Sequence, residues 1–183
     1  MCKDTAMASN IPILLISGPV GVGKTAVGNE VAEVLERDDV PHTFIDFDQI
    51  RYTYPRPDDD PWGNRLGLQN LAAIWENCSR AGALNLLVSY VVEEHSFIDS
   101  LSQVIPGGQV TTVQLSASTE ILSARLEGRE IGSGLDWHLQ RAAELSAILA
   151  SEGAPADYRI ATDNRGVINV AEDVASKLQW RRQ

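Results

Sequence analysis

The chain has 183 residues, of which 44% are hydrophobic and 22% are charged, and these values predict one globular domain with a full hydrophobic core. Its 25 acidic and 15 basic residues give a formal net charge of −10. Because nucleic acids and anionic membranes are bound through basic surfaces, this charge argues against both as the main partner.

Residues 1–10 lack the apolar segment of a signal peptide, and we interpret them as a flexible leader before a single domain at 11–183. The two cysteines, Cys2 and Cys78, do not have the spacing of metal ligands and fit a reducing, cytoplasmic setting. No apolar run is long enough to predict a membrane span.

Strands and helices are predicted to alternate along the domain. Short apolar runs predict strands at 11–16, 42–47, 83–92, 109–115 and 158–161. Apolar residues at helical spacing predict helices at 26–37, 62–81, 96–103, 118–127, 136–150 and 167–180. This order predicts an α/β fold of three layers, in which helices cover both faces of a five-stranded parallel sheet. Ligands of such folds bind at the carboxyl ends of the strands.

A phosphate-binding motif lies between the first predicted strand and the first predicted helix. Gly18–Thr25 matches G-x-x-x-x-G-K-[ST], the P-loop of nucleotide-binding proteins, and a glycine-rich turn without a nucleotide is the alternative. Glycines permit a tight turn that points main-chain N–H groups at a polyphosphate. Lys24 is the expected catalytic cation beside the β- and γ-phosphates, and the Thr25 hydroxyl is an expected Mg²⁺ ligand. The expected contacts of ATP are Gly18, Val20, Gly21, Val22, Gly23, Lys24, Thr25 and Ala26.

Two carboxylates follow the second predicted strand. Asp46 and Asp48 are two residues apart, so an extended chain would direct both to the same side, at the rim where the phosphates are expected. Carboxylates repel a polyphosphate unless a cation or a hydroxyl donor lies between them. We therefore interpret one of the two carboxylates as a support for Mg²⁺-bound water and the other as the group that orients and deprotonates an acceptor hydroxyl. The alternative is that both are solvated charges at a strand end, or that Asp48 caps the next turn.

The P-loop and the segment Asp46–Arg51 together resemble the small P-loop metabolite kinases, which include shikimate kinase, adenylylsulfate kinase, gluconate kinase and chloramphenicol phosphotransferase. The resemblance implies a fold like that of nucleoside monophosphate kinases, with a mobile lid. It also implies that Asp46 serves the Mg²⁺ shell and that Asp48 contacts the reacting hydroxyl. Adenylylsulfate kinases carry a similar D-G-D-x-[IV]-R, which implies a substrate contact for Arg51. Phe47 replaces the glycine of that motif, and this departure weighs against adenylylsulfate as the substrate.

Two arginines precede a glycine-containing break late in the chain. Arg125 and Arg129 are four residues apart and share a helix face, and the break at 132–134 is a candidate hinge. The resemblance implies that Arg125 stacks on adenine and that Arg129 clamps the transferring phosphoryl group, within a lid at 125–150. Neutralisation by neighbouring glutamates in surface ion pairs is the alternative.

The region 51–82 is expected to shape the acceptor pocket. Arg51, Arg65 and Asn64 are candidates there for binding polar or anionic groups of the substrate. On a later helix, Arg141 is a further candidate for an anionic group, and a solvated helix face is the alternative reading of this residue.

Two features of the sequence stand outside this chemistry. The third predicted strand lacks the terminal aspartate of many P-loop proteins, which weighs against motor-type and AAA-type ATPases. Ser89 and Glu93 are the polar residues nearest to that position, and the sequence leaves open which of them replaces the aspartate. We interpret Trp62, Trp75 and Trp137 as core or lid packing.

These features predict an ATP-dependent phosphotransferase that moves the γ-phosphoryl group of ATP to a hydroxyl of a small metabolite or antibiotic-like molecule. The alternatives are a nucleoside or nucleotide kinase, and a nucleotide-binding regulatory module without kinase activity. ATP, Mg²⁺ and a small-molecule acceptor are the expected partners. The sequence leaves the identity of the acceptor and the oligomeric state open.

Overall fold

The computed structural model describes residues 10–129 and 134–180, and for Arg129 the backbone only. Within this part, five parallel strands form one sheet in the order β2-β3-β1-β4-β5. The strands are β1 (Ile11–Ser17), β2 (His42–Asp46), β3 (Asn85–Ser89), β4 (Gly108–Ser116) and β5 (Tyr158–Ala161). The predicted five-stranded parallel sheet is confirmed. The leader expected at 1–10 lies almost wholly outside the described residues.

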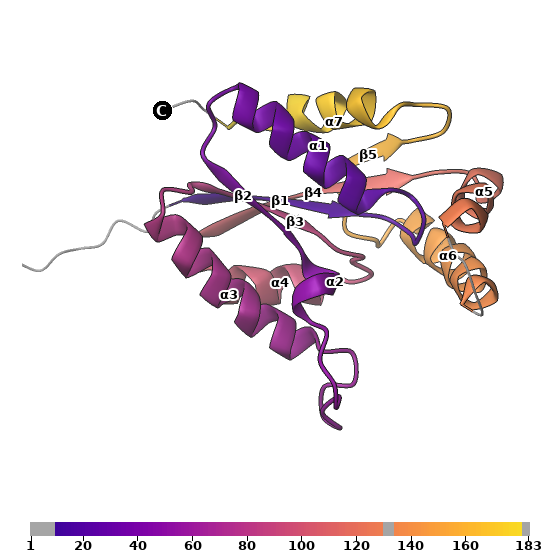
Figure 1. The fold of residues 1–183 in the computed structure, drawn as a ribbon, viewed down its shortest axis with the longest axis horizontal. Helices are drawn as coiled ribbons and strands as arrows, with labels where there is room; N and C mark the ends of the chain where they lie inside the picture. Colours follow the sequence, from indigo (N-terminus) through magenta and orange to yellow (C-terminus); the bar gives the residue numbers. More distant parts are fainter. Residues whose placement is uncertain (1–9, 130–133, 181–183) are drawn as a thin grey trace, which may run out of the picture.

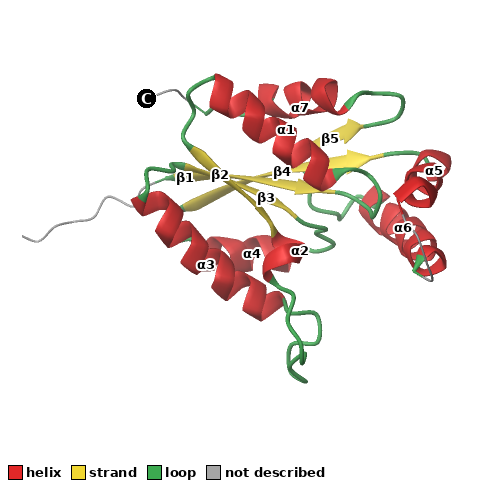
Figure 2. Cartoon of the chain, viewed as in Figure 1, coloured by secondary structure: helices red, strands yellow, loops and turns green. Residues whose placement is uncertain are grey.

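Helices cover both faces of the sheet, as Figures 1 and 2 show. One face is covered by α1 (Lys24–Arg37) and α7 (Val167–Ser176), and the other by α3 (Asn64–Arg80) and α4 (His95–Val104). The helices α5 (Thr119–Arg129) and α6 (Leu135–Ala150) lie at the carboxyl end of β4. A single helical turn, α2 (Phe47–Ile50), follows β2 directly.

The central strand β1 contributes to a hydrophobic core on each side of the sheet. Leu14 and Ile16 pack with residues of α1 and α7, whereas Ile13 and Leu15 pack with residues of α3 and α4. All four side chains are fully buried. Successive residues of a strand point to opposite faces, so a strand covered on both sides requires an unbroken apolar run.

The second predicted strand is one residue too long. β2 ends at Asp46, and Phe47 begins α2 with a fully buried ring. This ring packs on those of Tyr90 and Phe97, with centroid distances of 4.6 and 5.1 Å. Asp46 caps α2, because its Oδ1 accepts from the Asp48 N–H at 3.1 Å. The expectation that an extended chain directs both aspartates to one side is therefore wrong, and the cap of the turn is Asp46 rather than Asp48.

β3 is shorter than predicted, and α3 begins two residues later than predicted. Beyond β3 the chain leaves the ladder, and the Val92 N–H donates to Ser17 Oγ at 3.0 Å instead of to a strand carbonyl. Before α3, Gly63 adopts a φ of 69°, and the Asp60 carboxylate accepts from the Leu66 N–H at 3.0 Å. The contact with Asp60 satisfies one N–H donor of the first helical turn, and the turn at Gly63 marks where the helix starts.

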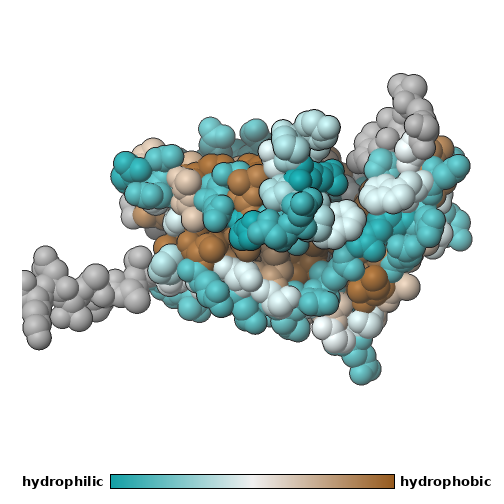
Figure 3. Space-filling view, turned by 90° about the horizontal axis from the view of Figure 1, so that it is seen from below, coloured by the Kyte–Doolittle hydropathy of each residue, from teal (hydrophilic) through white to brown (hydrophobic). Residues whose placement is uncertain are grey.

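The surface on the side of α3 and α4 is mixed in character. Figure 3 shows hydrophilic residues over most of this face, with hydrophobic residues gathered between them. In the part of the chain that the structure describes, every helix is too short or too polar to cross a membrane.

The packing of α3 on α2 leads to a prediction at Gly67. A Cβ there would lie 2.6 Å from Cζ of the buried Phe47 ring and 2.8 Å from Cβ of Arg51. Alanine is favoured over glycine in a helix by about 1 kcal/mol, but this steric overlap outweighs that preference. We expect Gly67→Ala to lower the free energy of unfolding by about 1–3 kcal/mol, measured by urea denaturation.

Gly128 is the matched control, because it also lies in a helix and a Cβ there would meet no described atom within 4 Å. Gly128→Ala should raise the free energy of unfolding by up to about 1 kcal/mol. Equal effects of the two substitutions would contradict the tight contact between α2 and α3.

Candidate active site

A cavity of about 1150 Å³ opens at the carboxyl ends of the strands. Its wall is formed by the P-loop, α2, the loop before α3, the segment after β3, α5 and α6. The predicted site residues on this wall are Val20, Gly21, Gly23, Lys24, Thr25, Ala26, Asp48, Arg51, Asn64, Arg125 and Arg141. Among the described residues, Gly18, Val22, Asp46 and Arg65 do not line the cavity.

The P-loop adopts a backbone conformation that its glycines make possible. Gly18, Gly21 and Gly23 have φ angles of 148°, 83° and 101°, in the region that side chains disfavour. At Gly18 a Cβ would also lie 2.6 Å from the carbonyl oxygen of Leu115. A curled loop of this kind, followed directly by the N-terminus of α1, directs N–H groups toward an anion.

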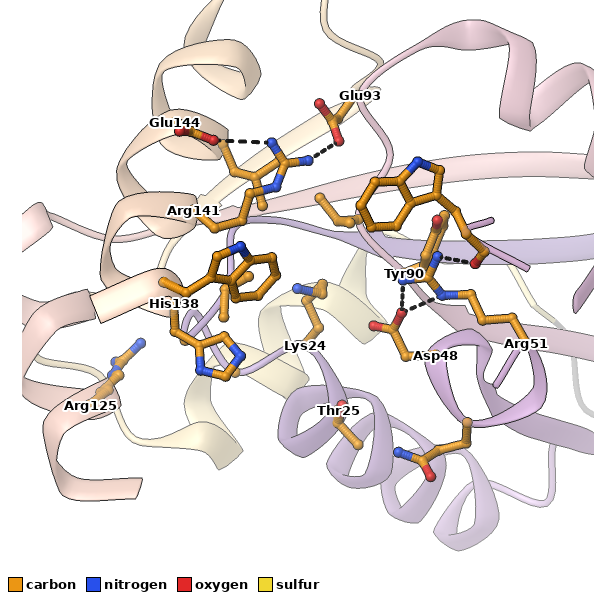
Figure 4. A pocket seen from close by; sticks show the side chains of 18 of the residues that line it. Lys24, Thr25, Asp48, Arg51, Tyr90, Glu93, Arg125, His138, Arg141 and Glu144 are labelled. Carbon is orange, nitrogen blue, oxygen red and sulfur yellow. Dashed lines mark hydrogen bonds and ion pairs between the residues drawn. The ribbon is translucent and has the colours of Figure 1, made fainter. Parts of the chain in front are cut away.

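The Lys24 ammonium lies near the middle of the cavity. Its Nζ donates to the carbonyl oxygens of Gly18 and Pro19 at 2.9 and 3.1 Å. Figure 4 places Lys24 between Asp48 on one side and His138 on the other. This position puts a positive charge beside the loop that would hold the phosphates.

Thr25 and Asp46 lie 21 residues apart in the chain, and their side chains form a hydrogen bond. The Thr25 hydroxyl donates to Asp46 Oδ2 at 2.6 Å. Mg²⁺ prefers such hard oxygen ligands, and it commonly binds one or two protein oxygens together with phosphates and water. In residues 10–129 and 134–180, no group of three or more His, Cys, Asp or Glu side chains is placed to hold a metal ion. Thr25 and Asp46 supply two oxygen atoms of the kind that Mg²⁺ prefers.

Arg51 holds Asp48 at the edge of the cavity. Its Nε and Nη2 both lie 2.8 Å from Asp48 Oδ1. Its Nη1 donates to the carbonyl oxygen of Trp62 at 2.8 Å and to Asn64 Oδ1 at 3.2 Å. The guanidinium carbon also lies 5.1 Å from the centre of the Tyr90 ring. Arg51 thus lines the cavity, as expected of a substrate contact, but its nitrogens bind groups of the protein itself.

Tyr90, to which the sequence did not point, supports this network. Its hydroxyl donates to Asn64 Oδ1 at 2.9 Å. Burial raises the pKa of Tyr90, so the hydroxyl stays protonated at neutral pH and remains a donor. The sequence placed Tyr90 inside the strand predicted at 83–92, and only the structure ends β3 at Ser89 and puts Tyr90 at the carboxyl end of the strand, where side chains reach the site.

Arg141 reaches from α6 to the segment after β3. Its Nη2 lies 2.5 Å from Glu93 Oε1, and its Nη1 lies 3.5 Å from Glu144 Oε2. Figure 4 shows the guanidinium between these two carboxylates. Of the two polar residues near the end of the third strand, Glu93 lines the cavity, whereas Ser89 is buried and does not.

Arg125 joins α5 to the P-loop and to the segment after β5. Its Nη1 donates to the carbonyl oxygen of Val22 at 3.0 Å and to Thr162 Oγ1 at 2.9 Å. Its Nη2 donates to the carbonyl oxygen of Thr162 at 3.0 Å. Contact of Arg125 with adenine stays a prediction. The side chain of Arg129 and residues 132–133 of the expected hinge lie outside the described part of the chain, so their roles also stay predictions.

Arg65 lies apart from the other predicted substrate residues. Its Nη1 and Nη2 lie 2.8 and 2.9 Å from the two carboxylate oxygens of Asp59, and both side chains are exposed. The Arg65 guanidinium lowers the pKa of the Asp59 carboxyl. The start of α3 directs Arg65 to the preceding loop and not to the cavity, so its position gives no support to substrate binding.

The tryptophans differ in their surroundings. Trp75 is 7% exposed and belongs to the core, as predicted. Trp62 and Trp137 are 66% and 58% exposed and line the cavity, so core packing is wrong for these two, and lid packing stays a prediction. An apolar side chain in a helical pattern is covered only where another element packs on it, and none in the described part covers these two indoles.

The fold matches solved structures of small P-loop kinases. The tunicamycin resistance protein of Deinococcus radiodurans has a TM-score of 0.62 at 22% identity, covering 93% of this chain and 97% of that chain. A gluconokinase from Sinorhizobium meliloti 1021 has a TM-score of 0.59 at 23% identity, covering 91% of each chain. Shikimate kinase from Acinetobacter baumannii, in complex with shikimate, has a TM-score of 0.58 at 19% identity, covering 94% of each chain.

No protein-family model matches this chain, and no curated protein matches its sequence. The structural likeness confirms the resemblance to small P-loop kinases that the motifs implied. At these identities, the likeness is one of fold alone.

The contacts of Arg125 lead to a prediction about stability without nucleotide. Arg125→Ala would lose three hydrogen bonds from a charged donor. We expect the free energy of unfolding of the ligand-free protein to fall by about 1.5–3 kcal/mol, measured by urea denaturation. Arg80→Ala removes an exposed arginine of α3 and should change it by less than about 0.5 kcal/mol. A ligand-free Arg125→Ala protein as stable as the wild type would show that Arg125 has no structural role.

Proposed function

We propose that the protein is an ATP-dependent kinase that transfers the γ-phosphoryl group to a hydroxyl of a small molecule. The observation that carries the proposal is that a P-loop and the carboxylate of Asp48 line one cavity. The P-loop supplies N–H donors and the charge of Lys24 for the phosphates, and Asp48 supplies a base for the acceptor. ATP and Mg²⁺ are part of this proposal.

Local donors are needed for nucleotide binding, because the net charge of −10 makes the overall field of the protein unfavourable for an anion. The P-loop amides, the N-terminus of α1 and Lys24 would provide them. Thr25 and Asp46 would hold Mg²⁺, which supplies neutralisation of the charge on the β- and γ-phosphates.

On the acceptor side, Asp48 would orient the reacting hydroxyl and take its proton. The acceptor oxygen forms a bond to the γ-phosphorus, the bond from that phosphorus to the bridging oxygen breaks, and ADP leaves. Among the described residues, the side-chain contacts of Asp48 with Arg51 use Oδ1. We therefore assign the proton of the acceptor hydroxyl to Asp48 Oδ2. Arg129, at the end of α5, would close over the transferring group and help to exclude water.

Asp48 also separates this proposal from a regulatory module and from a nucleotide kinase with a phosphate acceptor, but not from a nucleoside kinase with a ribose hydroxyl as acceptor. A regulatory module that only binds a nucleotide needs no base at the acceptor. A nucleotide kinase with a phosphate acceptor needs cations, rather than a carboxylate, next to the reacting oxygen.

Replacing Lys24 tests the nucleotide side. Lys24→Ala should lower turnover by about a hundredfold or more and weaken ATP binding, because it removes the positive charge beside the phosphates. The circular dichroism spectrum should match that of the wild type. Lys177→Ala, at the end of α7, is the control and should leave ADP formation and ATP affinity unchanged. Wild-type turnover in Lys24→Ala would contradict the P-loop assignment.

Replacing Asp48 tests the acceptor side. Asp48→Asn should lower kcat by about a hundredfold or more, the scale of a lost general base, with the affinity for ATP little changed. Steady-state ADP formation and calorimetric titration with an ATP analogue measure the two quantities. Asp99→Asn, on the exposed side of α4, controls for the loss of one carboxylate. Full activity in Asp48→Asn would assign the proton to another group.

A further inference from the structure

The wall around the proposed acceptor site carries charges that are already matched within the protein. We call the part of the cavity wall formed by α2, the loop before α3, the segment after β3 and α6 the acceptor wall. Its described cations are Arg51 and Arg141, and its carboxylates are Asp48, Glu93 and Glu144. The acceptor wall therefore has more carboxylates than guanidinium groups among the residues that the structure describes.

Arg141, like Arg51, is a guanidinium of this wall that the sequence made a candidate for binding an anionic group of the substrate. In the structure it lies between Glu93 and Glu144, with its side chain 30% exposed. A carboxylate or phosphate that approached Arg141 would have to displace Glu93. The displaced Glu93 would then face the incoming anion at short range, which costs Coulomb energy.

The guanidinium of Arg51 is also bonded to other groups of the protein. Its Nε and Nη2 contact Asp48, and its Nη1 contacts the Trp62 carbonyl oxygen and Asn64. One face of the guanidinium lies over the Tyr90 ring. Binding of a carboxylate by arginine uses a fork of two parallel N–H donors, and these contacts occupy the fork.

Two indoles give the same cavity a different kind of binding surface. Trp62 comes from the loop before α3, Trp137 comes from the first turn of α6, and both are more than half exposed on the cavity wall. The Trp137 ring is braced by His138, at 5.0 Å between ring centroids. Exposed aromatic faces on a concave wall bind the flat apolar face of a ligand ring and order it at low entropic cost.

We propose that the acceptor is an uncharged, polyhydroxylated ring compound, of the class of sugars and glycosides without a carboxylate or phosphate. Its ring stacks on Trp62 or Trp137, and its hydroxyl groups donate to the carboxylates of Glu93 and Glu144. A hydroxyl donates readily to a carboxylate, whereas an anionic substituent has no matched cation on this wall. This inference rests on the proposed kinase function and narrows its acceptor.

The test uses the full chain with Mg²⁺ and a panel of matched compounds. Each uncharged hexose, cyclitol, glycoside or nucleoside is paired with its carboxylate or phosphate counterpart, for example glucose with gluconate and with glucose 6-phosphate. Thermal stabilisation is measured with a non-hydrolysable ATP analogue, and ADP formation is measured with ATP. We expect stabilisation and turnover with uncharged members and neither with their anionic partners.

The outcomes separate this inference from the kinase proposal. Turnover with an anionic member above that with its uncharged partner overturns the inference and leaves the kinase proposal standing. The inference is also overturned if none of the uncharged compounds raises the thermal stability of the protein. If neither the uncharged nor the anionic compounds support ADP formation, the kinase proposal is overturned, and the inference with it.

Glu93→Gln tests the charge argument by itself. The substitution removes one of the two carboxylates beside Arg141, so carboxylate members such as gluconate should bind about tenfold more tightly than to the wild type. Glu172→Gln, on α7 and outside the cavity wall, removes an exposed carboxylate and should change no affinity. Unchanged affinity for carboxylates in Glu93→Gln overturns the charge argument.

Trp62→Ala and Trp137→Ala test the stacking argument. Removal of the indole that stacks on the acceptor should raise KM for the uncharged acceptor by about tenfold, with kcat and KM for ATP nearly unchanged. Tyr158→Ala removes an aromatic ring that is 41% exposed and outside the cavity wall, and it should alter neither constant. Wild-type KM for the acceptor in both tryptophan variants, or a rise confined to KM for ATP, overturns the stacking argument.

Discussion

One carboxylate connects the two halves of the candidate site. Asp46 accepts from the Thr25 hydroxyl at 2.6 Å and from the Asp48 N–H at 3.1 Å. Because Thr25 lies in the first turn of α1 and Asp48 in α2, this single side chain sets how far the phosphate-binding loop lies from the proposed base. The contact depends on parallel pairing in the sheet, which puts Asp46 beside Ser89 at the carboxyl end of β3.

Arginines make most of the other long-range links around the cavity. Arg51 joins α2 to the loop before α3, Arg125 joins α5 to the P-loop and to the segment after β5, and Arg141 joins α6 to the segment after β3. A guanidinium has five N–H donors in one plane, so one side chain can hold several acceptors at once. These links also neutralise cations that an anionic acceptor would need.

Predictions from the sequence were correct where a local pattern fixes the structure, and they were wrong where packing against another segment fixes it. The apolar runs predicted a parallel sheet covered on both faces, because a strand such as β1 must bury residues on each side. The helix α2 was missed, since a helix of four residues is too short for its period to show. Arg65 was expected at the substrate, but the face of α3 on which it lies meets Asp59 and not the cavity.

What the sequence by itself determined is the phosphate-binding loop, the alternation of strands and helices, and the identity of the two acids at the end of β2 and just beyond it. Each of these depends on residues close together in the chain, where backbone sterics and side-chain periodicity are sufficient. Only the tertiary structure decided which arginines are matched by carboxylates and which tryptophans face the cavity. Arg141 and Glu93 are 48 residues apart, and no local pattern shows that packing will bring such a pair together.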